Sequence, residues 1–265
     1  MSLAKRRLGS TGLEVSCLGL GTVKIGRNQE VKYPSGFSLP SDNEVTALLA
    51  QARELGINLL DTAPAYGSSE QRLGRLLTNR DDWVVCSKVG EEFTAGKSFF
   101  DFTAEHTRRS IERSLRNIRT EYLDIVLIHS DGRDRNILES SDCPATLLRM
   151  QEEGLIKAIG MSTKTVDGGM KALEMLDLAM VTYNPSMQDE VEVIDHALFL
   201  EKGILVKKAL NSGHAIATQD INEGAAGMSL TERNLRFALD REGVTSVIVG
   251  TINPKHLAEN VAAVQ

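Results

Sequence analysis

The sequence predicts a closed (β/α)₈ barrel, and three observations support this prediction. Short apolar runs rich in Val, Ile and Leu alternate eight times with amphipathic stretches of helical period. The composition does not shift along the 265 residues, so no linker or second domain is indicated. A barrel of this kind uses about 250 residues as one domain. We therefore expect residues 1–265 to form a single barrel, with an open doubly wound sheet as the alternative.

A short β-hairpin is predicted ahead of the alternating pattern. Its strands are Arg6–Leu8 and Glu14–Ser16, joined by a Gly-rich turn, and it would close the amino-terminal mouth of the barrel. The strands of the barrel are expected at 17–21, 57–61, 83–88, 124–129, 157–162, 179–184, 203–207 and 246–250. The helices are expected at 42–55, 68–78, 104–118, 140–153, 166–176, 190–201, 230–241 and 254–263.

Residues that favour helix ends support these boundaries. Ser41 and Glu44 form the pattern of a capping box before the first helix. Pro254 suits the first turn of the last helix, where its missing N–H needs no partner. Irregular segments that follow strands, and would lie on the carboxyl face of the barrel, are expected at 22–41, 89–103, 130–138 and 208–229.

Four polar side chains follow three consecutive predicted strands. Asp61 and Tyr66 follow one strand, Lys88 ends the next, and His129 ends the third. Taken singly, each has an ordinary structural explanation, such as a cap, a salt bridge or a satisfied core histidine. Adjacent barrel strands would bring all four to one mouth, where α/β barrels hold their catalytic groups. The set therefore favours an active site.

These four groups suit a reaction in which a carbonyl oxygen becomes an alkoxide and must be protonated. The positive charge of Lys88 beside Tyr66 would lower the pKa of the phenol from about 10 towards the working pH. Asp61 would keep Lys88 charged, and His129 can donate a hydrogen bond to a substrate oxygen. The set contains no electron source, so a cofactor must deliver the hydride.

The overall composition restricts the partners and the compartment. With 42% hydrophobic and 25% charged residues, the chain is typical of a soluble globular protein. Its formal net charge of −6 argues against nucleic-acid binding. No apolar run approaches the ~20 residues of a membrane-spanning helix, and the basic start lacks the apolar segment of a signal peptide. Three cysteines without paired spacing favour a reducing, cytoplasmic compartment.

Shorter motifs for phosphate and metal binding are incomplete. Gly19-Leu20-Gly21 begins like a dinucleotide fingerprint, but Lys24 stands at the third glycine position. Gly90–Gly96 has five residues between its glycines, where a P-loop has four. The five histidines have no metal-ligand spacing, so no metal is expected. Lys207 and Lys208 end a strand, where they could meet a phosphate or be solvated.

In the order of its motifs, the chain resembles the aldo-keto reductase superfamily over almost its whole length. Asp61-Thr62-Ala63-Pro64-Ala65-Tyr66-Gly67 matches the DTAxxYG signature of that family. Ser87-Lys88 and the segment from Tyr122 to His129 match its Lys and His segments. This order of motifs is highly specific, and it implies a (β/α)₈ barrel that transfers hydride to aldehydes or ketones.

The resemblance also implies a cofactor and a role for each residue. An extended NADPH would lie at the carboxyl mouth, with NADH possible, beside a small-molecule carbonyl substrate. Tyr66 would be the general acid, Lys88 and Asp61 would tune it, and His129 would orient the carbonyl. Cofactor contacts are implied at Gly21, Thr22, Ser162, Thr163, Asn184, Lys207, Lys208, Gly250, Thr251, Lys255, His256, Glu259 and Asn260.

Several positions depart from the family pattern on the cofactor side. Thr163 stands where an Asn usually follows the Ser, and Met180 stands where a Gln is usual. The position of a common aromatic platform falls on Lys208. Near the last strand, His256, with Lys255 alongside, stands where many members carry an Arg for the 2′-phosphate. The acid–base set is complete, so these departures bear on cofactor choice.

Three hypotheses follow, from different classes. The first is an NADPH-dependent carbonyl reductase. The second is a nucleotide-binding regulatory or sensor subunit of the same fold with little turnover, which the altered cofactor contacts favour. The third is an unrelated barrel enzyme, such as an isomerase, with Glu91 or Glu92 as its base. A monomer or a small homo-oligomer is equally compatible with the sequence.

Overall fold

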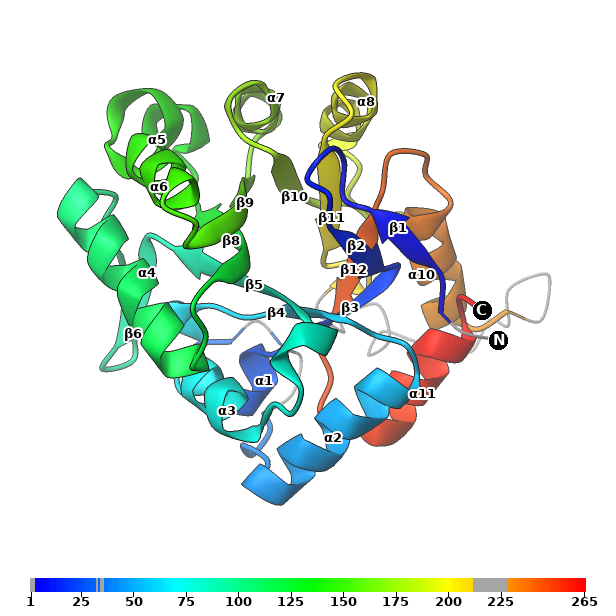
Figure 1. The fold of residues 1–265 in the computed structure, drawn as a ribbon. Coiled ribbons are helices and arrows are strands. Elements are labelled where there is room, and N and C mark those ends of the chain that lie inside the picture. The colour runs from blue at the N-terminus through cyan, green and yellow to red at the C-terminus, as the bar shows by residue number, and fades with distance from the viewer. Residues whose placement is uncertain (1–2, 32, 34–35, 212–227) are drawn as a thin grey trace.

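The computed structural model describes residues 3–31, 33, 36–211 and 228–265, and its centre is a closed barrel of eight parallel strands. Neighbouring strands follow the order β10-β11-β12-β3-β4-β5-β8-β9, which closes on itself (Figure 1). The strands are β3 (Leu18–Gly21), β4 (Leu59–Asp61), β5 (Val84–Val89), β8 (Leu123–His129), β9 (Ile156–Ser162), β10 (Leu178–Thr182), β11 (Gly203–Lys207) and β12 (Ser246–Val249). The predicted (β/α)₈ barrel is confirmed.

Amphipathic helices surround the barrel and bury their apolar faces against it. Leu73 of α3 and Ile111 of α4, for example, are fully buried in the layer between strands and helices. The eight helices of the repeating pattern are α2 (Asp42–Glu54), α3 (Ser69–Leu76), α4 (Ala104–Ile118), α6 (Cys143–Glu152), α7 (Val166–Met175), α8 (Val191–Phe199), α10 (Leu230–Leu239) and α11 (Pro254–Ala262). No helix in the described ranges is long and apolar enough to cross a membrane.

The hairpin of β1 (Lys5–Arg7) and β2 (Glu14–Ser16) closes the amino-terminal mouth, as predicted. Leu8 and Val15 are fully buried and pack into the interior of the barrel with Leu59 and Leu178, which begin two of its strands. The guanidinium of Arg6 donates to backbone carbonyls at 3.1 and 2.8 Å. Figure 1 shows this hairpin, in blue, beside β11 and β12.

The expected helix ends are present. The Ser41 side chain accepts from the backbone N–H of Glu44, and the Glu44 carboxylate accepts from the backbone N–H of Ser41 at 2.7 Å. Pro254 is the first residue of α11. Helix α6 begins at Cys143, three residues later than expected, with a proline in its first turn.

Short elements interrupt the segments that were expected to be irregular. They are the helices α1 (Val23–Gly26) and α5 (Asp134–Ser140), the 3₁₀ turns η1 (Pro64–Tyr66) and η2 (Arg80–Asp82), and the antiparallel pair β6 (Glu91–Thr94) and β7 (Lys97–Phe100). The turn between β6 and β7 has positive φ angles at Ala95 (52°) and Gly96 (78°). The expectation of an irregular 89–103 was therefore wrong. Most of the expected irregular segment 208–229 lies outside the described residues.

Candidate active site

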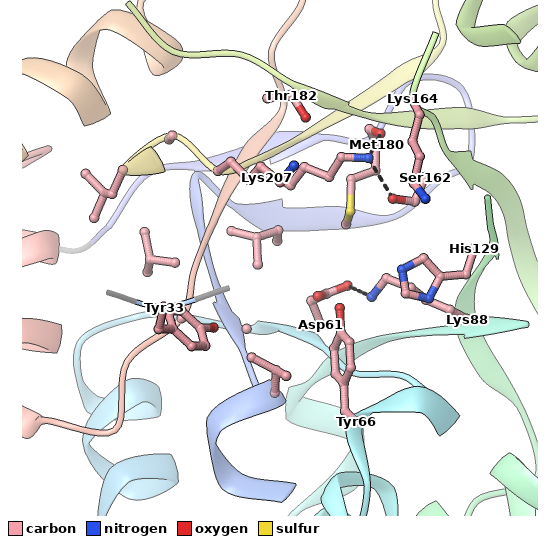
Figure 2. Close-up of a pocket in the computed structure, with 18 of the residues that line it drawn as sticks. Tyr33, Asp61, Tyr66, Lys88, His129, Ser162, Lys164, Met180, Thr182 and Lys207 are labelled. Carbon is pink, nitrogen blue, oxygen red and sulfur yellow. Dashed lines mark hydrogen bonds and ion pairs between the residues drawn. The ribbon is translucent and has the colours of Figure 1, made fainter. Parts of the chain in front are cut away.

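Three neighbouring strands and the turn after the first of them place the predicted catalytic residues at the carboxyl mouth of the barrel. Asp61 ends β4, Lys88 is the penultimate residue of β5, and His129 ends β8. Tyr66 ends η1, just after β4. Figure 2 shows these four side chains gathered at one side of the mouth, and all four line the same cavity.

Lys88 and Asp61 form a buried ion pair. The Nζ of Lys88 donates to the carboxylate of Asp61 and, at 2.9 Å, to the backbone carbonyl of Thr62. Only 2% of the Lys88 side chain and 6% of the Asp61 side chain are exposed. Burial disfavours the charged form of Lys88, but the negative charge of Asp61 outweighs it, so the pKa of Lys88 is raised. Lys88 therefore remains a cation.

The Tyr66 ring lies close to both this ion pair and His129 (Figure 2). The Nζ of Lys88 is 4.8 Å from the centroid of the Tyr66 ring, and the ring of His129 meets it edge to face at 6.4 Å. Burial and the negative charge of Asp61 raise the pKa of Tyr66, while Lys88 lowers it through its charge and a hydrogen bond. The expected effect of Lys88 is present, but it is smaller than the other two. Tyr66 is therefore a neutral phenol across the physiological range.

His129 has a carboxylate partner that the sequence did not indicate. Its Nδ1 lies 2.9 Å from an oxygen of Glu91, the first residue of β6, in an ion-pair contact rather than an aligned hydrogen bond. Burial alone would raise the pKa of Glu91, but His129, Ser98 and Arg27 lower it to about 2. Burial lowers the pKa of His129; Glu91 opposes this change, and the cations Lys88 and Lys207 add to it.

The cavity extends from the catalytic residues to the amino end of α11. Its volume is about 1210 Å³, above the ~300–1,000 Å³ typical of pockets for small ligands. The predicted cofactor-binding residues that line it are Gly21, Ser162, Thr163, Lys207, Lys208, Gly250, Thr251, His256, Glu259 and Asn260. Tyr33, which sequence reasoning missed, also lines it, and burial raises the pKa of its phenol to about 12.

Three of the residues predicted to contact the cofactor do not line the cavity. The Thr22 hydroxyl donates to the backbone carbonyl of Asp61 at 2.9 Å and is buried. Asn184 is also buried, and its amide donates to the backbone carbonyl of Lys208 at 2.9 Å. Lys255 points its Nζ toward Glu259, at 3.8 Å, with 81% of its side chain exposed. Thr22 and Asn184 support the backbone behind lining residues rather than facing the cavity.

Lys207, at the end of β11, reaches over β10 to the end of β9 (Figure 2). Its Nζ donates to the Ser162 hydroxyl at 2.9 Å and to the backbone carbonyls of Thr163 and Met180 at 2.5 and 3.3 Å. Burial lowers its pKa to about 8. Lys207 is thus held by protein acceptors instead of being solvated. The Thr163 hydroxyl turns away to the buried carboxylate of Glu190 at 2.6 Å, so Thr163 does not offer the donor that an Asn would.

The lining residues fit a nicotinamide dinucleotide. The Ser162 hydroxyl, near the catalytic residues, can hold a carboxamide, and Gly250 leaves backbone exposed where a long ligand would pass. Farther along, Asn260 and Glu259 offer polar groups for a ribose or an adenine. Within the described ranges, no three His, Cys, Asp or Glu side chains lie close enough to hold a metal ion; His214 lies outside those ranges.

Comparisons with known proteins agree with this geometry. A model of the Aldo/keto reductase family matches residues 17–215. This chain belongs to that family. A crystal structure assigned to an aldo-keto reductase from Pseudomonas aeruginosa is 52% identical, with a TM-score of 0.87, and covers 98% of this chain and 94% of its own.

Enzymes that act on sugars are among the more distant relatives. L-galactose dehydrogenase of Arabidopsis thaliana is 28% identical over 98% of this chain and 87% of that protein. D-threo-aldose 1-dehydrogenase of a Pseudomonas species is also 28% identical, over 98% of this chain and 92% of that protein. Aldo-keto reductases are oxidoreductases of small carbonyl compounds that generally use NAD(P)H, and both properties match a long cavity beside a protonated tyrosine.

Proposed function

We propose that this protein uses NADPH to reduce an aldehyde or ketone to an alcohol. The observation that carries this proposal is a neutral Tyr66 phenol close to both the Lys88 cation and His129, in a cavity of about 1210 Å³ that reaches α11. A carbonyl whose oxygen approached Tyr66 would meet a proton donor and a nearby positive charge. Both stabilise the alkoxide that develops on hydride addition.

In the proposed reaction, NADPH, when bound, would supply a hydride, which carries two electrons, for addition to the carbonyl carbon. Tyr66 gives its phenolic proton to the carbonyl oxygen as the carbon–oxygen double bond becomes single. Lys88 stabilises the phenolate that remains, and Asp61 holds Lys88 in place. Protonated His129 would donate to the substrate oxygen and orient it. Tyr66 then regains a proton from solvent.

The cofactor end of the cavity is assigned by the groups that line it. Ser162, held by Lys207, would bind the carboxamide, and Lys208 with the Gly250–Thr251 backbone would lie along the phosphates. His256, Glu259 and Asn260 would surround the adenosine. The 2′-phosphate of NADPH would rely on His256, Lys255 and the amino end of α11, since no Arg occurs after Gly250. We therefore propose a preference for NADPH over NADH that is modest.

The reverse reaction, oxidation of a sugar hydroxyl, is a second candidate because two relatives are named as sugar dehydrogenases. Oxidation needs Tyr66 as a base, and its raised pKa disfavours the phenolate below alkaline pH. Reduction is therefore the favoured direction near neutral pH.

The proposal is tested by titrating the protein with NADPH and NADH and then assaying a panel of aldehydes, ketones and diketones for NADPH consumption. Aldoses with NADP⁺ are assayed in parallel at neutral and alkaline pH. Reduction of at least one carbonyl class at neutral pH is the expected result. Tight nucleotide binding with no turnover in either direction would refute the proposal that the protein is a carbonyl reductase. It would support the hypothesis of a nucleotide-binding sensor.

A further inference from the structure

Glu91 approaches His129 from an element outside the barrel. The β6–β7 hairpin follows β5 directly, so its first residue lies beside the end of β8, where His129 is. The side chains of Glu91 and His129 are 15% and 19% exposed, and the 2.9 Å contact joins Oε2 of the carboxylate to Nδ1 of the imidazole. Both residues line the cavity.

The hairpin holds the Glu91 carboxylate in place. Across the strand pair, the Ser98 hydroxyl donates to Oε1 of Glu91 at 2.6 Å, which leaves Oε2 for His129. The guanidinium of Arg27 stacks 3.4 Å from the ring centroid of Phe93, on the same face of β6 as Glu91. Arg27 also donates to the backbone carbonyl of Ala65, next to Tyr66, at 3.1 Å. The carboxylate is thus built into the site.

A carboxylate at Nδ1 decides where the single proton of a neutral imidazole lies. A negative charge 2.9 Å from Nδ1 favours the proton on that nitrogen, which leaves Nε2 with a lone pair. In that state Nε2 can accept a hydrogen bond but cannot donate one. Only the imidazolium form carries a proton on both nitrogens and can donate through Nε2.

We propose that Glu91 is a positioning residue that fixes the Nδ1–H tautomer of His129, so that protonation converts Nε2 from an acceptor to a donor. The effect of this tautomer on turnover rests on the function proposed above. Imidazolium would assist a carbonyl oxygen in reduction, and neutral His129 would accept from an alcohol in oxidation. His129 would therefore favour reduction as the pH falls and oxidation as it rises.

The charged and titratable groups around this pair come from several elements. Lys88 of β5 and Lys207 of β11 act on His129, Tyr66 of η1 meets its ring, and Arg27 acts on Glu91. The two lysines oppose imidazolium and Glu91 favours it. Loss of the Glu91 charge should therefore make His129 harder to protonate.

The tautomer is measured by nitrogen NMR of the histidine side chains in the ligand-free protein, with His129→Asn to assign the signal. In the wild type, neutral His129 should show a protonated Nδ1 and an unprotonated Nε2. In Glu91→Gln, the midpoint of its titration should fall by about 1–2 pH units. Glu92→Gln is the matched control, because Glu92 is the adjacent residue of β6 but pairs with Arg113 on the other face.

Two results would overturn the proposal: a proton on Nε2 in the neutral wild type, or an unchanged His129 midpoint in Glu91→Gln. The first result is measured on the wild type. The proposal can therefore be overturned even if Glu91→Gln does not fold. These NMR readouts are independent of turnover, so they separate a wrong tautomer from a wrong reaction. In the active enzyme, the pH profile of kcat/KM for reduction should shift to lower pH in Glu91→Gln and stay in place in Glu92→Gln.

Discussion

At the scale of single residues, the site depends on charges that are buried together. Lys88 and Asp61 are almost completely buried, and each satisfies the charge of the other. The Glu91 carboxylate lies against the His129 imidazole, whose ring also meets that of Tyr66. Burying a charge is costly unless a partner compensates for it. Removing Lys88 or Asp61 alone should therefore cost stability as well as affect the proposed chemistry.

Replacing Lys88 by Met should leave the Asp61 charge buried without its partner. We expect the free energy of unfolding to fall by about 3–5 kcal/mol, as is typical when one member of a buried ion pair is removed. Turnover should also fall, while the affinity for the nucleotide changes little. Urea denaturation measures the first effect. The double variant Lys88→Met/Asp61→Leu should recover part of the lost stability but none of the lost activity. Equal stabilities of the wild type and Lys88→Met would contradict this account.

The Glu91 pair should make stability depend on pH in the acidic range. The pKa of Glu91 is about 2 in the folded protein and near 4.5 for an ordinary Glu. Its charged form therefore stabilises the fold above pH ~4.5, by roughly 3 kcal/mol, and this contribution is lost as the pH falls towards 2. The difference in unfolding free energy between wild type and Glu91→Gln should shrink over that window. A difference that stays constant from pH 6 to 3 would show that the carboxylate charge is not responsible.

At the scale of elements, close backbone contacts hold the catalytic loop against its neighbours. Gly67 follows Tyr66 with φ of 62°, and a Cβ there would lie 2.2 Å from the carbonyl oxygen of Gly26, at the end of α1. A Cβ at Gly26 would in turn lie 2.2 Å from the carbonyl oxygen of Tyr66. The short helix α1 therefore fixes the position of η1 and of the Tyr66 ring.

Gly67→Ala should disturb the Tyr66 position as well as strain the backbone. We expect a loss of about 1–3 kcal/mol from the positive φ alone, and more from the contact with Gly26. Turnover should fall because the phenol moves. Gly154→Ala is the matched control, since its φ is 80° but no atom lies within 4 Å of the new Cβ. Thermal unfolding and steady-state rates of the two variants distinguish backbone strain alone from strain that also displaces Tyr66. Normal turnover in Gly67→Ala would refute the role of this contact.

The amino end of α11 should set the choice between nucleotides. Asn253 caps the helix by accepting from the backbone N–H of Lys255, and His256 lines the cavity. One lysine and a helix end favour a phosphate by about 1–3 kcal/mol, so NADPH should bind roughly 5- to 150-fold more tightly than NADH. Quenching of Trp83, the only tryptophan, measures both dissociation constants.

Salt and Lys255→Met should each weaken NADPH binding more than NADH binding, because only NADPH carries the additional charge. Equal affinities for the two nucleotides, or tighter binding of NADH, would show that α11 does not recognise the 2′-phosphate.

At the scale of the whole molecule, local sequence patterns predicted the barrel, but contacts between residues far apart in the sequence were not predicted. Strand and helix periods are local, and the carboxyl ends of parallel strands share one face, so the positions of Asp61, Lys88 and His129 followed from the sequence. The Glu91–His129 contact depends on a hairpin whose turn, Ala95-Gly96, is a weak signal. The Lys207–Ser162 contact passes over β10 from β11 to β9, and no spacing in the sequence encodes it.

The same distinction explains why Thr22 and Asn184 lie behind the cavity instead of in it. Gly21, which precedes Thr22 in the chain, and Lys208, whose carbonyl accepts from Asn184, both line the cavity. Whether a side chain beside such a residue turns in or out depends on local backbone geometry. A hydroxyl or amide that satisfies a buried carbonyl is favoured to turn inward to the protein.

The most direct test of the central claim is a single-turnover measurement of hydride transfer from bound NADPH to the best carbonyl substrate, in wild type and Tyr66→Phe. The substitution keeps the ring and removes only the donated proton. We expect the rate to fall by roughly 10²-fold or more, with the dissociation constant of NADPH unchanged. Tyr122→Phe, at a half-buried phenol outside the cavity, should behave as wild type. A Tyr66→Phe protein that transfers hydride at the wild-type rate would contradict the account.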